Sequence, residues 1–345
     1  GLVDFLENNK IKVFGPNKLC SQLEGSKIFT KKICEKFKIP TAKFGIFKNE
    51  TQTKEFLKTT NYPTVIKADN LASGKGVYIC NNIREASFAV DEIFNGKFGE
   101  AKNILVEEFL DGEEMSFFII SDGNTFKTFG TAQDHKRVLE GDKGKNTGGM
   151  GCYSPSRLIT NELEEKIINK IIKPTLRGLN EFQEKFKGFL YAGLMIVENE
   201  PYLIEYNVRM GDPECQTILP RLETNFFKII KAVIEEKLSQ IDLNWSDNKT
   251  LSIVLCSEGY PETFQNKKEI KNLDKIVLTE DQFIFHAGTK FENSTMVSNG
   301  GRVLNFVAKS NSFEKSREIV LSLIKKIDFK DSFYRKDIGF KVIDT

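Results

Sequence analysis

The segment from Phe189 to Glu214 constrains the fold more than any other part of the chain. Phe189–Tyr206 reads as an apolar strand, a turn and a second strand. Side chains alternate along a strand, so Leu203, Glu205 and Asn207 are expected on one face. A carboxylate and an amide oxygen on one face suit Mg²⁺, which prefers oxygen ligands and shares them with water and phosphate. The alternative is a solvated strand face, because Glu and Asn are ordinary exposed residues.

Length and charge limit the classes of protein that remain. A chain of 345 residues is too long for one core and predicts two or three domains. Lys+Arg 50 against Asp+Glu 48 leaves a net charge of +2, so no nucleic-acid partner is indicated. The longest mostly apolar run, 189–197, is far shorter than a membrane span, so no membrane association is expected.

Cysteine spacing indicates the compartment. The six cysteines lie far apart and form no C-x-x-C pair, which argues against a zinc site and against a disulfide framework. A reducing, cytoplasmic setting is therefore expected. The chain begins at Gly1 with an apolar pattern already under way, so we expect it to start inside a domain.

The patterns predict a mixed α/β (α+β) fold with a smaller α+β block at its end. Strands are expected at 11–14, 63–68, 77–80, 104–108, 115–121, from 125 onward, and at 250–256, 283–287 and 301–308. Helices are expected at 27–37, 83–94, 162–186, 225–238 and 313–326, and a long glycine-rich loop at 140–155.

Lys67 and the small-residue loop that follows it suit a nucleotide. Lys67 lies on an apolar strand, where a buried charge needs a partner such as a phosphate. The loop 71–77 offers backbone NH groups, with Lys75 as a point charge. It fits neither a Walker P-loop nor a dinucleotide fingerprint, because Asp69, Gly76 and Ile79 stand where those motifs need other residues. A plain hairpin turn is the alternative.

Two further segments carry polar groups suited to binding. Backbone groups of 106–110 can hydrogen-bond to the edge of an adenine, and a carboxylate beyond them can bind the ribose. The alternative is that these acidic residues are simply solvent-exposed, as is common at a strand end. Thr131–Arg137 and the glycine loop 146–151 resemble an anion cradle, because three glycines in four positions suit a close backbone approach. His135 has no partner set for a nucleophile triad and can equally be a satisfied imidazole.

Together these segments resemble the glycinamide ribonucleotide synthetase family (phosphoribosylamine-glycine ligases) of the ATP-grasp superfamily. The resemblance rests on ordered motifs at 14–16, 23–27, 67–69, 74–77, 107–110, 133–137, 146–155, 191–195, 205–214 and 298–303. Departures from the family pattern are Asn70, Ser73, Lys145 and Cys152, and none of them removes a charged group.

The resemblance implies a domain plan. An ATP-grasp domain of two α+β subdomains that clasp ATP is expected at 27–238, with a smaller lid-bearing part at 27–120 and a larger part at 121–238. A small C-terminal α+β domain is expected at 239–345. Residues 1–26 are expected to be the tail of a Rossmann-like N-terminal domain, and the rest of that domain, supplied in trans, is then an expected partner.

The resemblance also implies a reaction. Family members join glycine to 5-phosphoribosylamine with ATP, through glycyl phosphate, giving glycinamide ribonucleotide, ADP and phosphate in de novo purine biosynthesis. Such chemistry requires charge neutralisation and positioning rather than a protein nucleophile.

By the same resemblance, each segment has a role. The metal, Mg²⁺ or Mn²⁺, is expected at Glu205 and Asn207. ATP is expected at Lys27, Lys67, Ser73, Gly74, Lys75, Gly76, Glu107, Glu108, Phe109, Leu110 and Glu114. Glycine and phosphoribosylamine are expected at Asp134, His135, Asn146, Thr147, Gly148, Gly149, Met150, Gly151, Asp212, Pro213 and Glu214. The catalytic groups are expected to be Arg209, Lys136 and Arg137.

Two other functions remain open at this point. One is another ATP-grasp carboxylate-amine ligase, since Lys67, Glu205 and Asn207 mark only the superfamily. The other is a non-catalytic Mg-ATP-binding fragment, which the incomplete first domain suggests. The motifs at 149–155 and 211–214 argue against the first alternative. Release of ADP that depends on glycine and phosphoribosylamine would separate the ligase from a fragment, which could bind Mg-ATP without releasing ADP.

Overall fold

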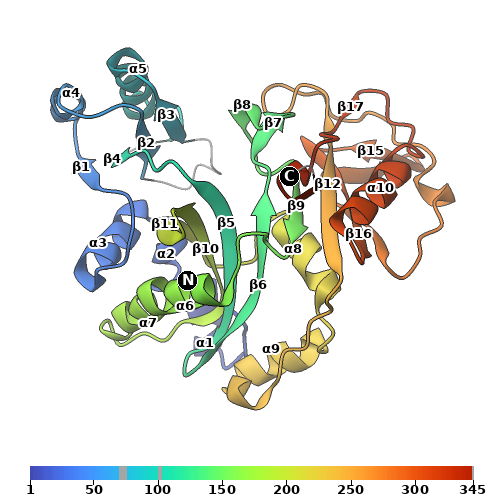
Figure 1. Ribbon diagram of the computed structural model, residues 1–345, viewed down its shortest axis with the longest axis horizontal. Coiled ribbons are helices and arrows are strands. Elements are labelled where there is room, and N and C mark those ends of the chain that lie inside the picture. The colour runs from blue at the N-terminus through green and yellow to red at the C-terminus, as the bar shows by residue number, and fades with distance from the viewer. Residues whose placement is uncertain (70–75, 100–102, 344–345) are drawn as a thin grey trace. The chain divides into compact units, whose positions relative to one another are not determined.

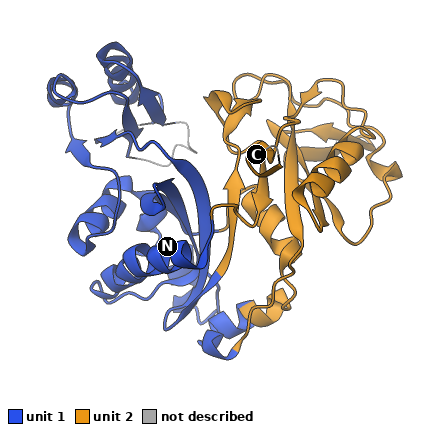
Figure 2. Ribbon diagram, in the orientation of Figure 1, with its two compact units in different colours: residues 1–128, 159–209, 230–240 blue, residues 129–158, 210–229, 241–345 orange. Residues whose placement is uncertain are grey.

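The chain is organised as two compact units (Figure 2). The structure, a computed structural model, describes residues 1–69, 76–99 and 103–343. Unit 1 comprises 1–128, 159–209 and 230–240, and unit 2 comprises 129–158, 210–229 and 241–345. The domain plan expected from the sequence stays a prediction, since compact units and domains are defined on different grounds.

Unit 1 mixes helices and strands (Figure 1). Its helices are α1 (Leu2–Asn8), α2 (Gln22–Gly25), α3 (Lys27–Phe37), α4 (Glu50–Leu57), α5 (Ile83–Phe94), α6 (Asn161–Ile167) and α7 (Lys173–Asn180). Its strands are β1 (Phe44–Phe47), β2 (Thr64–Ala68), β3 (Val77–Cys80), β4 (Ile104–Glu108), β5 (Glu113–Asp122), β10 (Lys187–Val197) and β11 (Glu200–Asn207). A 3₁₀ turn occupies Leu238–Gln240.

A four-stranded antiparallel sheet in unit 1 has the order β1-β4-β2-β3. Helices α4 and α5 pack on it through buried apolar side chains, including Leu57, Val90 and Ile93 against Ile66 and Val106. The apolar positions of α5 recur at helical spacing, which explains why this segment forms a helix and buries one face.

In unit 1, strands β11, β10 and β5 are neighbours in that order at one end of a larger sheet, and β10 and β11 form the hairpin of residues 187–207. The β10–β11 hairpin turns at Glu198 and Asn199, whose φ angles of 48° and 61° fit a tight turn between strands. The pairing shifts between Gly193 and Leu194, so β11 carries a bulge near Ile204. A bulge reverses the alternation of side chains.

The bulge corrects one expectation. Leu203 and Tyr206 are both buried, at 1% and 2% exposure, whereas Glu205 and Asn207 are half-buried. Leu203 therefore groups with Tyr206, and the prediction that it shares a face with Glu205 and Asn207 is wrong. Glu205 and Asn207 share a face by ordinary strand alternation, and the extra residue separates both from Leu203.

Two elements belong to both units. Strand β6 (Phe126–Asp134) follows β5 and continues into unit 2, where Gln133 pairs with Tyr153. Helix α9 (Phe226–Ile234) begins in unit 2 and ends in unit 1. The predicted hairpin between 115–121 and the strand after 125 is confirmed.

Unit 2 is built mainly from short strands (Figure 1). Its strands are β7 (Arg137–Leu139), β8 (Lys143–Asn146), β9 (Gly151–Ser154), β12 (Lys249–Ser257), β13 (Gln282–His286), β14 (Thr289–Glu292), β15 (Thr295–Ser298), β16 (Arg302–Ser310) and β17 (Ser332–Phe333). Its helices are α8 (Glu214–Ile218), α10 (Phe313–Ile324) and α11 (Phe340–Ile343), with 3₁₀ turns at Leu219–Arg221 and Leu273–Lys275.

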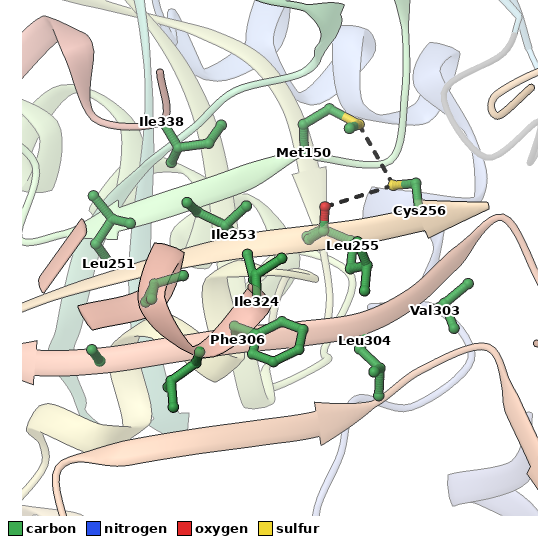
Figure 3. Close-up of a cluster of buried hydrophobic side chains, with 14 of the residues drawn as sticks. Met150, Leu251, Ile253, Leu255, Cys256, Val303, Leu304, Phe306, Ile324 and Ile338 are labelled. Carbon is green, nitrogen blue, oxygen red and sulfur yellow. Dashed lines mark hydrogen bonds between the residues drawn. The ribbon is translucent and has the colours of Figure 1, made fainter. Parts of the chain in front are cut away.

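The core of unit 2 lies on an antiparallel sheet ordered β9-β12-β16-β13. Figure 3 shows Ile253 and Leu255 of β12 beside Phe306 of β16 and Ile324 of α10. Met150 lies in the same cluster, where the Cys256 thiol is 3.8 Å from its sulfur. Burial of this apolar surface is the main force that holds the unit together.

The structure also corrects several expected elements. The strand expected at 11–14 is irregular, the helix expected at 162–186 ends at Asn180, and the loop expected at 140–155 contains β8 and β9. Residues 168–172 form a π-helical turn between α6 and α7. The helix at 27–37 and the strands at 64–68, 77–80 and 104–108 are confirmed.

Candidate functional site

The N-terminus of α3 positions Lys27. The Ser26 hydroxyl accepts a hydrogen bond from the Phe29 N–H at 3.1 Å, and the Asp69 carboxylate accepts one from the Ile28 N–H at 3.1 Å. These are N-capping bonds, which satisfy donors that a helix start leaves unpaired. Burial lowers the pKa of Lys27, and the nearby charge of Glu205 partly restores it.

Two buried lysines near Lys27, namely Lys31 and Lys67, share the carboxylate of Glu107. Lys67 Nζ lies 2.9 Å from Glu107 Oε2, and Lys31 Nζ lies 3.2 Å from Glu107 Oε1. The three side chains are 3–7% exposed. Burial lowers the pKa of Lys31, while Glu107 opposes that shift. The partner that the sequence argument required for Lys67 is therefore an acid of the chain itself, and the group retains one excess positive charge.

Glu205 and Asn207 follow on β11 with Arg209 just beyond. Arg209 donates from Nη2 to Asn207 Oδ1 at 3.2 Å and forms an ion pair with Glu24 at 2.9 Å. An amide oxygen has two lone pairs, so one remains on Asn207. A carboxylate and an amide oxygen on one face are the hard donors that Mg²⁺ takes, so these residues fit that ion.

The other residues expected to bind ATP differ in their exposure to solvent. Ser73, Gly74 and Lys75 lie outside the described residues. Gly76 is buried, and its carbonyl accepts from the Ala68 N–H at 2.9 Å. Glu108, Phe109 and Glu114 are exposed, and Leu110 is half-buried.

In unit 2, Asp134 ends β6 and His135 follows it directly. The His135 N–H donates to the Gly151 carbonyl at 2.9 Å, and its carbonyl accepts from the Met150 N–H at 2.9 Å. The imidazole is 1% exposed, and its Nε2 accepts from the Gly339 N–H at 3.2 Å. Burial and the adjacent Arg335 charge lower the pKa of His135 to about 4. The imidazole is therefore neutral near pH 7 and acts as an acceptor.

The glycine loop closes tightly on this strand end. The Thr147 N–H donates to the Lys136 carbonyl at 2.8 Å. Gly149 has a φ of +116°, and a Cβ there would lie 2.5 Å from Pro213 Cδ and 2.7 Å from Asp134 Oδ1. Only glycine fits such a position. The close approach of backbone expected for this loop is thus present, and it brings Asp134, Gly149 and Pro213 together.

Arg302 ties the glycine loop to the Asp212 turn. Its Nη1 donates to the carbonyls of Gly148 and Asp212 at 2.7 and 2.6 Å, and its Nη2 lies 3.0 Å from Asp212 Oδ2. The Gly148 N–H donates to the Tyr260 hydroxyl at 2.9 Å. Glu214, at the start of α8, is 3% exposed.

Other expected substrate and catalytic residues occupy varied surroundings. Arg137 donates to the Gly144 carbonyl at 2.7 Å, across the β7–β8 hairpin. Asn146 is exposed and Lys136 is half-buried. The Met150 side chain is fully buried in the core of unit 2, so only its backbone is available to a ligand.

Sequence reasoning missed several residues of these two groups. Lys31 reads as one of many lysines on a helix face, and Tyr260 carries no local signal. Glu24 lies in the motif at 23–27 and could have been found from it. Arg302 lies in the motif at 298–303 and could have been found from it. The roles expected for individual side chains stay predictions, and the structure shows which of them lie together within each unit.

The described residues include no helix long and apolar enough to cross a membrane. They also include no cluster of three or more His, Cys, Asp and Glu side chains suited to a metal ion. A metal at Glu205 and Asn207 would therefore need further ligands from water or a bound phosphate.

Comparison with solved structures shows the fold class of this chain. The structure is similar to a phosphoribosylamine–glycine ligase from Thermotoga maritima, with a TM-score of 0.88 and 34% identity, over 98% of this chain and 84% of that one. It is also similar to the biotin carboxylase domain of a Hydrogenobacter thermophilus 2-oxoglutarate carboxylase, with a TM-score of 0.69 and 18% identity, over 96% and 72%. The second likeness concerns the fold alone. The fold is that of the ATP-grasp enzymes, as the sequence predicted.

The family follows from the sequence. The family models for the phosphoribosylglycinamide synthetase ATP-grasp (A) domain and C domain match residues 25–215 and 250–341. Phosphoribosylamine–glycine ligase of Brucella melitensis is 43% identical over 345 residues, which is 100% of this chain and 81% of that protein. The chloroplastic enzyme of Arabidopsis thaliana is 43% identical over 99% of this chain and 66% of that protein. The chain belongs to the phosphoribosylglycinamide synthetase family.

Proposed function

We propose that this protein joins glycine to 5-phosphoribosylamine at the expense of ATP, giving glycinamide ribonucleotide, ADP and phosphate in de novo purine biosynthesis. The observation that carries the proposal is identity above 40% to phosphoribosylamine–glycine ligases along essentially the whole chain. The two alternative functions are not favoured, because the motifs beyond those of the superfamily match this family.

Unit 1 supplies the groups for ATP in this proposal. Lys27 and Lys67 neutralise the phosphates, and the buried Lys31–Glu107 pair fixes the direction in which Lys67 points. Glu205 and Asn207 would hold Mg²⁺, which supplies charge neutralisation to phosphate oxygens when bound. Glu107–Leu110 and Glu114 frame the adenosine.

Unit 2 supplies groups for the two substrates. Asp134, the Asn146–Gly151 loop and Asp212–Glu214 bind glycine and the phosphoribosylamine. Charge develops on a phosphoryl group when the glycine carboxylate attacks ATP, and later on the acyl phosphate when the amine displaces phosphate. In the proposal, Lys136 and Arg137 of unit 2 and Arg209 of unit 1 each stabilise that charge, as a reaction that depends on positioning and electrostatics requires.

The proposal also places the reaction in the cytoplasm. All six cysteines are free, which suits a thiol-reducing compartment. Supporting evidence would be activity that persists unchanged in millimolar thiol, as expected of an enzyme without a structural disulfide.

The test is ADP release from Mg-ATP by the purified chain, with and without glycine plus freshly generated phosphoribosylamine. We expect release that requires both substrates and stops when EDTA removes the metal. Binding of Mg-ATP by calorimetry without any substrate-dependent ADP release would contradict the proposed ligase function.

A further inference from the structure

Arg335 is a buried cation that none of the roles above uses. It lies between β17 and α11, and its side chain is 1% exposed. It directs its donors to two places. Nε and Nη2 donate to the two carboxylate oxygens of Asp337 at 2.8 and 2.7 Å. Nη1 donates to the Arg137 carbonyl at 2.9 Å and to Asp142 Oδ1 at 2.8 Å.

The second set of contacts reaches a distant part of the sequence. Arg137 starts β7, and Asp142 lies in the turn between β7 and β8. One guanidinium therefore holds both the base and the turn of this hairpin. Burial would raise the pKa of Asp142, but hydrogen bonds from Lys341 and Arg335 bring it below its usual value.

Neighbouring residues of the same segment add further bonds to the hairpin. The Gly141 N–H donates to Asp337 Oδ2 at 2.8 Å, and the Lys336 N–H donates to Glu140 Oε1 at 3.2 Å. The Gly339 N–H reaches the His135 imidazole at 3.2 Å. Residues 335–341, which we name the clasp, thus hold the chain on both sides of Lys136.

Stability alone is a weak explanation for this arrangement. A buried ion pair gains little over apolar packing, because desolvation offsets most of the attraction. What a guanidinium offers is a planar fork with fixed geometry, which defines the position of several acceptors at once. Here the acceptors belong to the segment that carries Lys136 and Arg137.

We propose that Arg335 is a positioning residue for the reaction, because it fixes the backbone from His135 to Asp142 and thereby places Lys136 and Arg137 for an anionic substrate. The inference rests on the proposed function for its kinetic consequence. The structural part, a hairpin held by the clasp, stands independently of that function.

The test uses Arg335→Lys, which keeps the charge but cannot form the fork. Its matched control is Arg221→Lys, since Arg221 is also buried in unit 2 and donates to Ser154 and to the carbonyls of Ser246 and Asn248. Hydrogen exchange measured by mass spectrometry comes first. We expect Arg335→Lys to speed exchange at least tenfold in peptides covering 137–147, and Arg221→Lys to leave those peptides unchanged.

Steady-state kinetics is the second measurement. We expect Arg335→Lys to lower kcat/KM for phosphoribosylamine at least tenfold, with the dissociation constant for Mg-ATP within twofold of the wild type. Asp142→Ala removes the acceptor that Arg335 Nη1 uses on the hairpin side, so the double variant should lose no more than the worse single variant. Additive losses would overturn the proposal.

Different results would contradict the proposed ligase function and the positioning role of Arg335. Wild-type protein that releases no ADP with both substrates would end the proposed function, while hydrogen exchange would still decide whether Arg335 holds the hairpin. Unchanged exchange at 137–147 in Arg335→Lys would overturn the inference even in a fully active enzyme. If Arg335→Lys folds poorly, Asp142→Ala alone tests whether the Arg335–Asp142 contact holds the hairpin.

Discussion

At the residue scale, Arg209 combines exposure with fixed geometry. Its side chain is 58% exposed, yet Glu24 and Asn207 both hold it. An exposed guanidinium held in place is suited to meet charge that develops in a transition state. It also touches the amide oxygen proposed as a metal ligand, so it can influence both.

We expect Arg209→Ala to lower turnover at least 100-fold while Mg-ATP binding changes less than threefold, because the loss concerns the transition state. Substrate-dependent ADP release and calorimetry measure the two quantities. Arg84→Ala, at an exposed position of α5, is the control and should keep wild-type turnover. Turnover by Arg209→Ala within threefold of the wild type would refute the catalytic role.

His135 should make folding sensitive to acid. Its pKa is about 4 in the folded chain against an ordinary 6.5, so the unfolded chain takes up the proton first as pH falls. The contribution of the neutral imidazole to the free energy of unfolding is fully present above pH 6.5. It is lost as the pH falls from 6.5 to about 4. The groups that set this pKa, after burial itself, are Arg335, Asp142, Lys341 and Asp337.

The measurement is urea unfolding from pH 7 to pH 4 for wild type and His135→Gln. The wild type should lose about 3 kcal/mol more than the variant over this range. His286→Gln changes the other, exposed histidine and should follow the wild type. Parallel curves for wild type and His135→Gln would mean that the imidazole does not stay neutral in the folded chain.

At the element scale, the start of α3 links folding to the proposed ATP site. Ser26 caps the helix and also donates to Asp69 at 3.3 Å, and Asp69 bonds the Ile28 N–H. The same bonds that begin the helix therefore determine where Lys27 lies. Loss of the cap should affect stability and ATP binding together.

We expect Ser26→Ala to lower the free energy of unfolding by about 1 kcal/mol and to weaken Mg-ATP binding several-fold. Ser312→Ala removes the equivalent cap of α10, where Ser312 accepts from the Lys315 N–H at 3.2 Å. This control should cost similar stability and leave ATP binding unchanged. Equal effects of both variants on ATP binding would argue that the α3 cap has no special link to Lys27.

Elements with a strong local signal were predictable from sequence. The helix at 27–37 has a cap and helical spacing of apolar residues, and the β10–β11 hairpin has two apolar runs around a turn. The bulge near Ile204 was not predictable, because it depends on how β11 pairs with β10. Likewise β8 is made of Lys143–Asn146, all exposed, and only its pairing with β7 makes it a strand.

The residues of the candidate site also differ in whether the sequence alone could predict them. Motifs contiguous in sequence, such as 133–137 and 205–214, could be found directly, since their residue types are unusual for their surroundings. Lys31 and Arg335 gain their meaning from contacts with Glu107 and Asp142, which lie 76 and 193 residues away. One sequence without its relatives gives no means to pair such residues.

At the scale of the whole molecule, the six cysteines are distributed over both units. Cys20, Cys34 and Cys80 belong to unit 1, and Cys152, Cys215 and Cys256 to unit 2. Five are buried and Cys215 is half-buried. Burial raises the pKa of every one of these thiols, to about 11 for Cys215. Buried thiols in apolar surroundings are unreactive.

We expect fewer than one thiol to react rapidly with an aromatic disulfide reagent in the native chain at pH 8, and six after unfolding in guanidinium chloride. Cys215→Ser should remove most of the native reactivity. Rapid labelling of two or more thiols without denaturant would show that at least one unit opens readily.

The interleaving of the two units has a consequence for synthesis on the ribosome. The chain changes unit after residues 128, 158, 209, 229 and 240, so neither unit is a continuous stretch. Strand β9 can pair with β12 only when residues 249–257 have emerged, about a hundred positions later. Until then β9 can pair only with β6, and loop closure of that length slows folding. A nascent chain stopped anywhere from residue 129 to residue 239 therefore contains two unfinished units rather than one finished unit.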